Sequence, residues 1–175
     1  NLSGIAKGYA ADSVASLLEE AGAKRYMVEI GGEITVEGTN AYGKSWNLGI
    51  NRPTPEASQF ELIETVRMSQ GAMATSGSYR NFFNQDGRRY HHIIDPRTGE
   101  PVEHTLVSVT VIASSCMLAD ALATAAMVLG RQEFEQVLNK YFPGVSALFV
   151  HQEQNEFKVS RSSNFPKNVD AEVAR

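Results

Sequence analysis

The chain has 175 residues and a mass of 19.1 kDa, enough for one domain with a sizeable core. Its residues are 42% hydrophobic and 21% charged, which excludes collagen, coiled coils and wholesale disorder. The formal net charge of -4 argues against a nucleic-acid-binding protein, and no apolar run approaches the roughly 18 residues of a transmembrane helix. The single cysteine, Cys116, excludes an intrachain disulfide and is expected to be a small buried side chain.

The first half of the chain is predicted to form one helix followed by strands. Apolar residues at three- and four-residue spacing predict a helix over residues 9–22. Residues 26–36 are rich in β-formers and indicate a strand. The pair Gly31-Gly32 interrupts this strand and suggests a bulge or a close backbone approach. Further strand candidates are residues 46–50 and 60–66.

The second half is predicted to begin with loops and to end in helices and a hairpin. Residues 71–90 hold clusters of Gly, Ser, Thr and Asn and are predicted to be rich in loops. The alternating, β-branched segment Leu106–Ala113 predicts a strand. The other predicted elements are a short strand at 89–94, an apolar helix at 116–129 closed by Gly130, an amphipathic helix at 131–142, a hairpin of residues 145–151 and 157–160, and a frayed tail from Ser162.

Hairpin-like strands mixed with helices predict an α+β fold, in which a mainly antiparallel sheet packs against two or three helices. The chain opens with Asn1-Leu2-Ser3-Gly4, without an initiator methionine or signal sequence, as if it began inside a functional loop. We therefore expect residues 1–175 to form a single domain that is the C-terminal part of a longer protein, with a polar tail at 162–175.

Three segments carry residues suited to a phosphate-containing ligand, and each has a purely structural alternative. Residues 2–8 run into a helix whose first N–H groups favour anions, where Lys7 could meet a phosphate; the alternative is an ordinary helix cap. Gly31 and Gly32 could let a flat group approach the backbone, or form a bulge. Residues 74–82 combine hydroxyls, a glycine and an arginine beside aromatic residues, and could hold a phosphate or a ring system; the alternative is an ordinary polar loop.

Two adjacent histidines, His91 and His92, lie on the predicted strand at 89–94. Neighbouring strand residues point to opposite faces, so the pair is poorly arranged to bind one metal ion. One of them could act as a general base near neutral pH, and the alternative is a structural hydrogen bond.

Asp120 is the only charged residue between Val109 and Gly130. A carboxylate in so apolar a helix must be paired or bind a cation, because burying it unpaired is costly. Thr124 lies four residues further on, so both side-chain oxygens project from one helix face. Such a pair suits a hard cation such as Mg²⁺, and the alternative is an aspartate that caps the helix.

These segments, in this order, resemble the C-terminal part of the ApbE family of FAD:protein FMN transferases. The motifs run from Leu2 to about Gly130 and read LSGIAKGYA, VEIGGEI, ATSGSYRNF, HIIDPRTGEPV, SVTVIA and ADALATA. The resemblance implies an enzyme that splits the diphosphate of FAD with Mg²⁺, passes FMN to a Thr or Ser hydroxyl of an acceptor protein and releases AMP. It also implies acceptors of the redox-pump-subunit type and a periplasmic or exported protein, attached to the inner membrane only through a lipid anchor outside this chain.

The same resemblance assigns roles to individual residues. His92 would be the base that takes the proton of the acceptor hydroxyl, and Asp120 and Thr124 would bind Mg²⁺ with the backbone carbonyl of Gly4. The residues implied to contact FAD are Asn1, Lys7 and Ile94, with Gly31, Gly32, Ser76 and Gly77 lining the flavin pocket. The chain departs from the family pattern at Asn1, where Asp is usual, and at Ala123, where some members carry a second Asp. Hydrolysis of FAD to FMN and AMP, and a flavin-binding module without catalysis, are the alternative functions.

Overall fold

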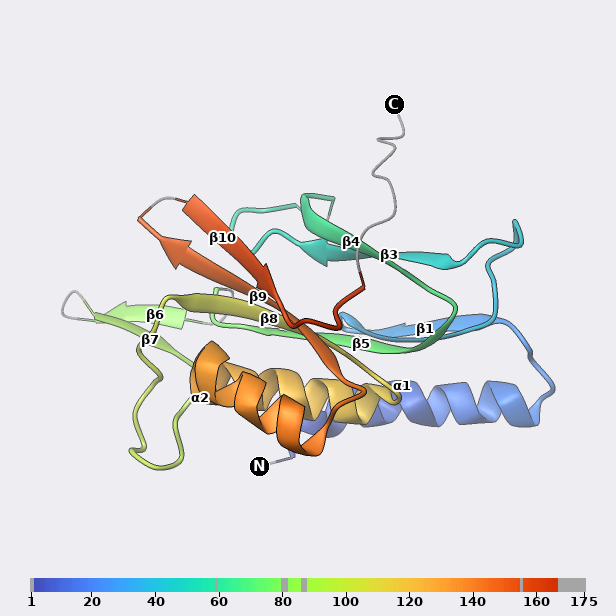
Figure 1. Ribbon diagram of the computed structural model, residues 1–175, viewed down its shortest axis with the longest axis horizontal. Helices are drawn as coiled ribbons and strands as arrows, with labels where there is room; N and C mark the ends of the chain where they lie inside the picture. Colours follow the sequence, from blue (N-terminus) through green and yellow to red (C-terminus); the bar gives the residue numbers. More distant parts are fainter. Residues whose placement is uncertain (1, 59, 80–81, 86–87, 155, 167–175) are drawn as a thin grey trace.

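The described part of the chain forms a central sheet with helices on one face and a smaller sheet on the other (Figure 1). The structure is a computed structural model, and it describes residues 2–58, 60–79, 82–85, 88–154 and 156–166. The elements in chain order are α1 (Ser3–Glu20), β1 (Tyr26–Ile30), β2 (Glu33–Glu37), β3 (Trp46–Asn51), β4 (Leu62–Met68), β5 (Gln70–Gly77), β6 (Phe82–Gln85), β7 (Arg88–His91), β8 (Leu106–Ala113), α2 (Cys116–Tyr141), β9 (Ser146–Glu153) and β10 (Glu156–Arg161).

The central sheet has the strand order β1-β2-β5-β8-β9-β10. Every neighbouring pair in it is antiparallel. The hairpins β3–β4 and β6–β7 form separate two-stranded sheets. This arrangement confirms the predicted α+β fold with a mainly antiparallel sheet and helices packed against it. Neither helix in the described part of the chain is long and apolar enough to cross a membrane.

Apolar side chains cover both faces of the central sheet. On one face, Val109 and Val111 of β8 pack with α2 residues such as Phe134. On the other, Leu148 and Val150 of β9 pack beneath the β3–β4 hairpin. Because alternate strand residues point to opposite faces, the two layers draw on different side chains of the same strands. The sheet is therefore held between α1 and α2 on one side and β3–β4 on the other.

Strand β5 is the main departure from the predicted elements. The sequence predicted loops over 71–90, but Gln70–Gly77 is an inner strand of the sheet, between β2 and β8. Thr75 and Ser76 gave this segment its loop-like composition. In the structure, the Thr75 hydroxyl lies 2.8 Å from that of Thr110 on β8, so the polar side chain is paired within the sheet. Two short strands, β6 and β7, take up part of the remaining segment.

Two further predictions are corrected near the N-terminus. Helix α1 begins at Ser3 rather than at residue 9, so Gly4 and Lys7 are helical and not part of a loop. Gly31 and Gly32 do not form a bulge inside one strand. They are the two-residue turn of the β1–β2 hairpin, with φ of +59° and +96°. Glycine adopts such left-handed angles without the strain that a β-carbon would cause.

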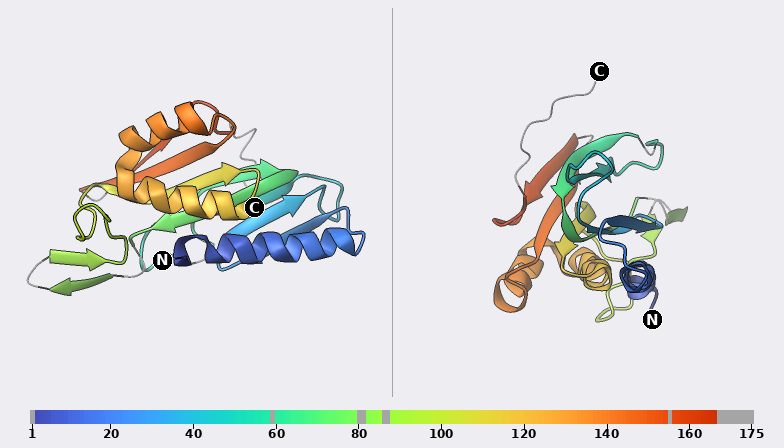
Figure 2. Two further views of the ribbon diagram at one scale, coloured as in Figure 1. Left: turned by 90° about the horizontal axis from the view of Figure 1, so that it is seen from below. Right: turned by 90° about the vertical axis from the view of Figure 1, so that its right-hand side faces the viewer.

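Helix α2 and the terminal hairpin follow the prediction closely. Gly130 has φ +74° and ψ +168°, which breaks the helix into two segments at the predicted position. Figure 2 shows the second segment folding back beside the first. The predicted strand Leu106–Ala113 and the hairpin that forms β9 and β10 are also present, and Cys116 is buried.

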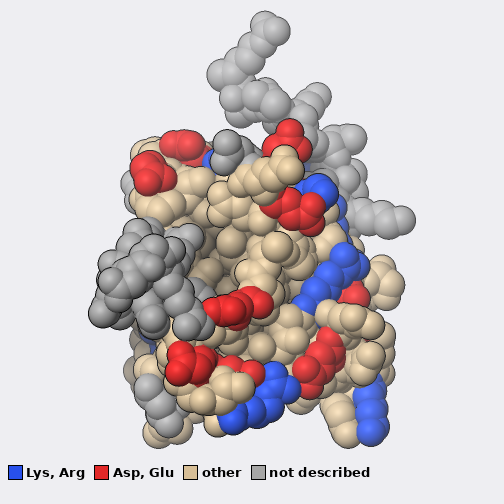
Figure 3. All heavy atoms as spheres, turned by 90° about the vertical axis from the view of Figure 1, so that its left-hand side faces the viewer, with Lys and Arg blue, Asp and Glu red and all other residues tan. Residues whose placement is uncertain are grey.

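Charged side chains of both signs are interspersed on the end of the molecule that carries the β6–β7 hairpin (Figure 3). Several pair with each other on the surface. Lys158 contacts Glu153 across the β9–β10 hairpin, and Arg161 contacts Glu64, which joins β10 to β4. The Lys158–Glu153 pair is exposed on both sides, and such pairs contribute little stability on their own. On the described surface seen in Figure 3, neither sign of charge forms a continuous patch.

Asp12 connects the two helices at the beginning of α2. From the middle of α1, its carboxylate accepts hydrogen bonds from the backbone N–H groups of Cys116, at 2.8 Å, and Met117, at 2.9 Å. These N–H groups have no partner within their own helix. The Ser115 hydroxyl completes the cap by accepting from Leu118 at 3.3 Å.

Substitution of Asp12 by Ala is therefore expected to lower the free energy of unfolding by about 1–2 kcal/mol, the usual cost of losing a helix cap. Urea denaturation of the two proteins measures the change. Ser16→Ala is the control, since its exposed hydroxyl donates to the carbonyl of Asp12 within α1. Equal stability of the two variants would contradict the capping role.

Candidate functional site

A pocket of about 630 Å³ lies where the N-terminal end of α1, the β1–β2 turn, the end of β5 and the first segment of α2 meet. It collects most of the residues that the sequence singled out. Those expected to bind metal or to act as the base are Gly4, His92, Asp120 and Thr124. Those expected to contact the flavin nucleotide are Lys7, Gly31, Ser76, Gly77 and Ile94. Gly32 does not line the pocket, and Asn1 lies outside the described residues.

The carboxylate and hydroxyl of α2 face the beginning of α1. Asp120 is only 4% exposed and accepts a hydrogen bond from the backbone N–H of Gly8 at 3.0 Å. One turn along α2, the Thr124 hydroxyl lies 3.1 Å from that of Ser76 on β5. A β-carbon on Gly4 would lie 3.3 Å from the Thr124 hydroxyl oxygen, so the α1 backbone runs close beside it. Three oxygen-bearing side chains from two elements, α2 and β5, thus line the pocket together, with the α1 backbone close beside them.

Gly8 allows the two helices to approach this closely. A β-carbon at this position would lie 2.4 Å from the carbonyl oxygen of Cys116, well inside van der Waals contact. In a regular helix the Gly8 N–H pairs with the carbonyl of Gly4. Here the Gly8 N–H donates to the carboxylate of Asp120. The carbonyl oxygen of Gly4 can therefore accept or coordinate a further group.

Burial raises the pKa of Asp120, while the Gly8 N–H and the nearby Lys7 ammonium act in the opposite direction. A carboxylate in this situation gains from any further cation placed beside it. Among the described residues, no three His, Cys, Asp or Glu side chains gather as a metal site. A bound ion would therefore draw on the hydroxyl, the backbone and the ligand's own oxygens. This donor set fits Mg²⁺, which proteins often bind through one or two carboxylates and substrate phosphates.

Lys7 reaches from α1 to the turn of the β1–β2 hairpin. Its ammonium donates to the carbonyl oxygen of Gly31 at 3.2 Å and lies 2.7 Å from the carboxylate of Glu33. Glu33 was not predicted as a site residue, because the sequence alone does not show that its carboxylate meets Lys7. The signal that could have found it is its position directly after a glycine turn, opposite a lysine that reaches the same turn.

His92 follows β7 directly and is exposed, although it lines the same pocket as the buried Asp120. The next residues turn back on themselves, since Ile94 forms a β-bridge with Pro101. Tyr79 and Thr75 also line the pocket; both lie in the candidate segment 74–82, although neither was singled out as a site residue. The Tyr79 ring explains the glycine before it, because a β-carbon on Gly77 would lie 2.5 Å from a ring carbon.

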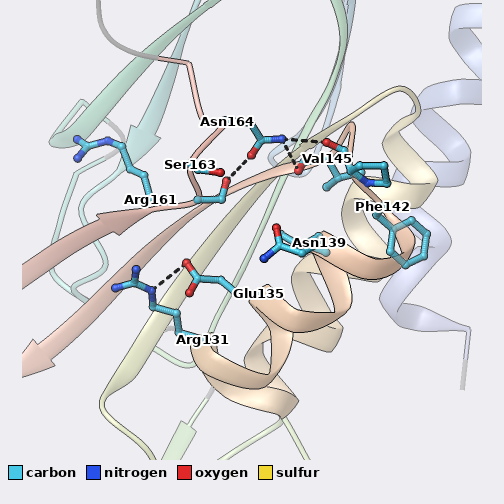
Figure 4. A pocket seen from close by; sticks show the side chains of 11 residues that line it. Arg131, Glu135, Asn139, Phe142, Val145, Arg161, Ser163 and Asn164 are labelled. Carbon is cyan, nitrogen blue, oxygen red and sulfur yellow. Dashed lines mark hydrogen bonds and ion pairs between the residues drawn. The ribbon is translucent and has the colours of Figure 1, made fainter.

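A second pocket, of about 450 Å³, lies between the second segment of α2 and the residues that follow β10 (Figure 4). It contains none of the predicted site residues. Its polar groups pair with each other: Arg131 with Glu135, and the Asn164 amide with the carbonyls of Pro143 and Val145, at 3.3 and 2.9 Å. The beginning of the tail that was predicted to fray is thus anchored, and the buried Phe165 holds it further. Residues 167–175 lie outside the described part.

The comparisons with known proteins agree with the resemblance seen in the sequence. The ApbE family pattern matches residues 1–149. The chain is 41% identical over 165 residues to an FAD:protein FMN transferase of Salmonella typhimurium, covering 94% of this chain and 46% of that protein. It is 44% identical to an FAD:protein FMN transferase of Vibrio cholerae, covering 94% and 48%.

Two solved structures share the fold. The flavin transferase ApbE from Vibrio cholerae superposes with a TM-score of 0.78 at 42% identity, covering 92% of this chain and 50% of that one. The ApbE protein from Thermotoga maritima superposes with a TM-score of 0.79 at 35% identity, covering 94% and 52%. The chain spans about half the length of the curated relatives it matches. On this evidence the chain belongs to the ApbE family.

Proposed function

We propose that this protein transfers FMN from FAD to a Thr or Ser hydroxyl of an acceptor protein, with release of AMP and in a reaction that depends on Mg²⁺. The observation that carries the proposal is one pocket in which Asp120 and Thr124, the Lys7 ammonium and His92 come together from three separate parts of the chain. The names of the curated relatives, FAD:protein FMN transferase, support FAD as the substrate.

Asp120 and Thr124, with the backbone of Gly4 beside them, would hold the metal ion. Bound there, Mg²⁺ would offset the negative charge of the FAD diphosphate. Lys7 lies on the adjacent wall of the pocket and adds a positive charge for the same group. The diphosphate would then lie between α1 and α2.

His92 is suited to serve as the base for a hydroxyl that arrives from outside. It lines the pocket and is exposed, whereas Asp120 is 4% exposed, so an acceptor hydroxyl from solution can reach His92. In the reaction, the acceptor oxygen forms a bond to the FMN phosphorus as the bond from that phosphorus to the AMP oxygen breaks. The hydroxyl proton passes to the imidazole of His92.

Replacement of His92 by Ala is expected to slow transfer by about 100-fold or more, the usual contribution of a positioned general base. Binding of FAD, followed by flavin fluorescence, should persist, because the carboxylate and lysine are retained. The matched control is His151→Ala on β9, whose ring bonds to Thr105 outside the pocket. Transfer by the His92 variant at the rate of the control would assign the base to another residue.

The proposal is tested by incubating the protein with FAD, Mg²⁺ and an acceptor fragment that carries a target Thr. Intact mass spectrometry of the acceptor should show the addition of one FMN, and a chelator should prevent it. Release of AMP without a modified acceptor would contradict transfer and show that the protein hydrolyses FAD. If FAD binds but neither AMP nor a modified acceptor is found, both reactions are contradicted and the protein is a flavin-binding module.

A further inference from the structure

The pair formed by Lys7 and Glu33 joins a half-exposed ammonium to a buried carboxylate. Glu33 is the first residue of β2, and its side chain is only 2% exposed, whereas the side chain of Lys7 is 48% exposed. Burial raises the pKa of Glu33, and so does the nearby Asp120, against the lowering effect of the Lys7 ammonium. A buried carboxylate needs a paired cation, and the pair as a whole is weak evidence for a gain in stability. Both residues line the pocket, so the pair is placed to act on a ligand there.

The hairpin turn is shaped to receive Lys7. The ammonium donates a hydrogen bond to the Gly31 carbonyl at 3.2 Å and forms an ion pair with the Glu33 carboxylate at 2.7 Å. A β-carbon on Gly31 would lie 3.1 Å from Cδ of Lys7, so a side chain at this position would displace the lysine stem. An ammonium has three N–H donors, and Lys7 directs one of them to the Gly31 carbonyl, so Lys7 keeps donor capacity for a ligand in the pocket.

We propose that Glu33 is a positioning residue: with the Gly31 carbonyl it holds the Lys7 ammonium against the pocket wall, so that one N–H addresses the diphosphate of FAD. This inference rests on the function proposed above. A free lysine side chain loses much rotamer freedom when it binds a phosphate, and a lysine already held by its partners loses less. Glu33 thus acts on the nucleotide only through Lys7, and Gly31 contributes by making room for the lysine stem.

The test is a double-mutant cycle of FAD binding with Glu33→Gln, Lys7→Met and the two together, read by quenching of flavin fluorescence in the presence of Mg²⁺. Glu33→Gln keeps the shape of the side chain and removes its charge. We expect it to weaken FAD binding about tenfold in the unsubstituted background, and less than twofold when Lys7 is already Met. A residue with a merely structural role would weaken binding equally in both backgrounds.

Glu29→Gln is the matched control, since Glu29 is exposed on β1 of the same hairpin. Lys7→Met leaves Glu33 buried without its cation, so circular dichroism melting must show that each variant is folded. If Lys7→Met does not fold, Glu33→Gln is compared with the double variant instead. The FAD affinities of these two proteins should then agree within about threefold.

Binding by Glu33→Gln as tight as that of Glu29→Gln, or tighter than that of the unsubstituted protein, would overturn the positioning role. Tighter binding would mean that the carboxylate opposes the phosphate more than it places the lysine. Because binding is measured apart from transfer, the two proposals can fail separately. An unsubstituted protein that binds no FAD would contradict both. One that binds FAD but modifies no acceptor would contradict only the transfer reaction.

Discussion

Substitution of Asp120 by Asn is expected to reduce transfer of FMN by at least about 100-fold while the protein stays folded. The amide keeps the shape of the side chain and can still accept the hydrogen bond from the Gly8 N–H. It removes the one carboxylate among the proposed metal-binding groups. Because burial raises the pKa of Asp120, the ionised side chain costs the fold stability at neutral pH, and Asn removes that cost.

The measurement is the rate of acceptor modification over a series of Mg²⁺ concentrations, with thermal melting of each variant. Thr124→Val should also raise the Mg²⁺ requirement, since it removes the neighbouring hydroxyl without changing the volume of the side chain. Glu133→Gln is the control, because Glu133 lies on the same helix but is exposed and pairs with Arg97. Retained transfer by the Asp120 variant would remove the carboxylate from the proposed metal site.

Substitution of Gly8 by Ala is expected to have the largest effect on stability. Helix propensity alone favours Ala over Gly by about 1 kcal/mol. Packing opposes the substitution and is expected to lower the stability. The new β-carbon would lie 2.4 Å from the carbonyl oxygen of Cys116, a backbone atom that can move only with its helix. We expect a net loss of about 3 kcal/mol, near the upper end for overpacked sites. In a domain of this size that is a fall in Tm of roughly 6–12 °C.

Thermal melting of Gly8→Ala beside Gly144→Ala tests this expectation. Gly144 is the matched control because a β-carbon there would meet no atom within 4 Å. The Gly8 variant should also bind FAD more weakly, since a shift of α1 relative to α2 separates Gly4 from Thr124. A stability equal to or above that of the control would show that the two helices do not pack as closely at Gly8 as described.

Patterns within a single element were sufficient to predict the parts of the fold that depend on local spacing. The alternation in Leu106–Ala113 and the apolar periodicity on either side of Gly130 correspond to β8 and to the two segments of α2. The four-residue interval from Asp120 to Thr124 brings both oxygens to one pocket, because helix geometry alone sets their relative position. The resemblance to a family supplied most of the other site residues.

Features that depend on distant parts of the chain were not predicted. Residues Thr75 and Ser76 look like loop residues until β8 and α2 supply partners for their hydroxyls. Glu33 on β2 is ion-paired with Lys7, which lies on a different element, α1. Gly8 has the appearance of an ordinary glycine near a helix start, and only the crossing of α1 over α2 shows why no side chain fits there.

The most direct test of the central claim, that this pocket passes FMN to a protein hydroxyl, is the ratio of AMP released to acceptor modified in one sample. The protein, FAD, Mg²⁺ and an acceptor fragment with a target Thr are combined, AMP is quantified by chromatography, and the FMN-bearing acceptor by intact mass. We predict one AMP for each FMN attached, with both products lost when Asp120 is replaced by Asn. AMP released while the acceptor keeps its original mass would contradict the claim.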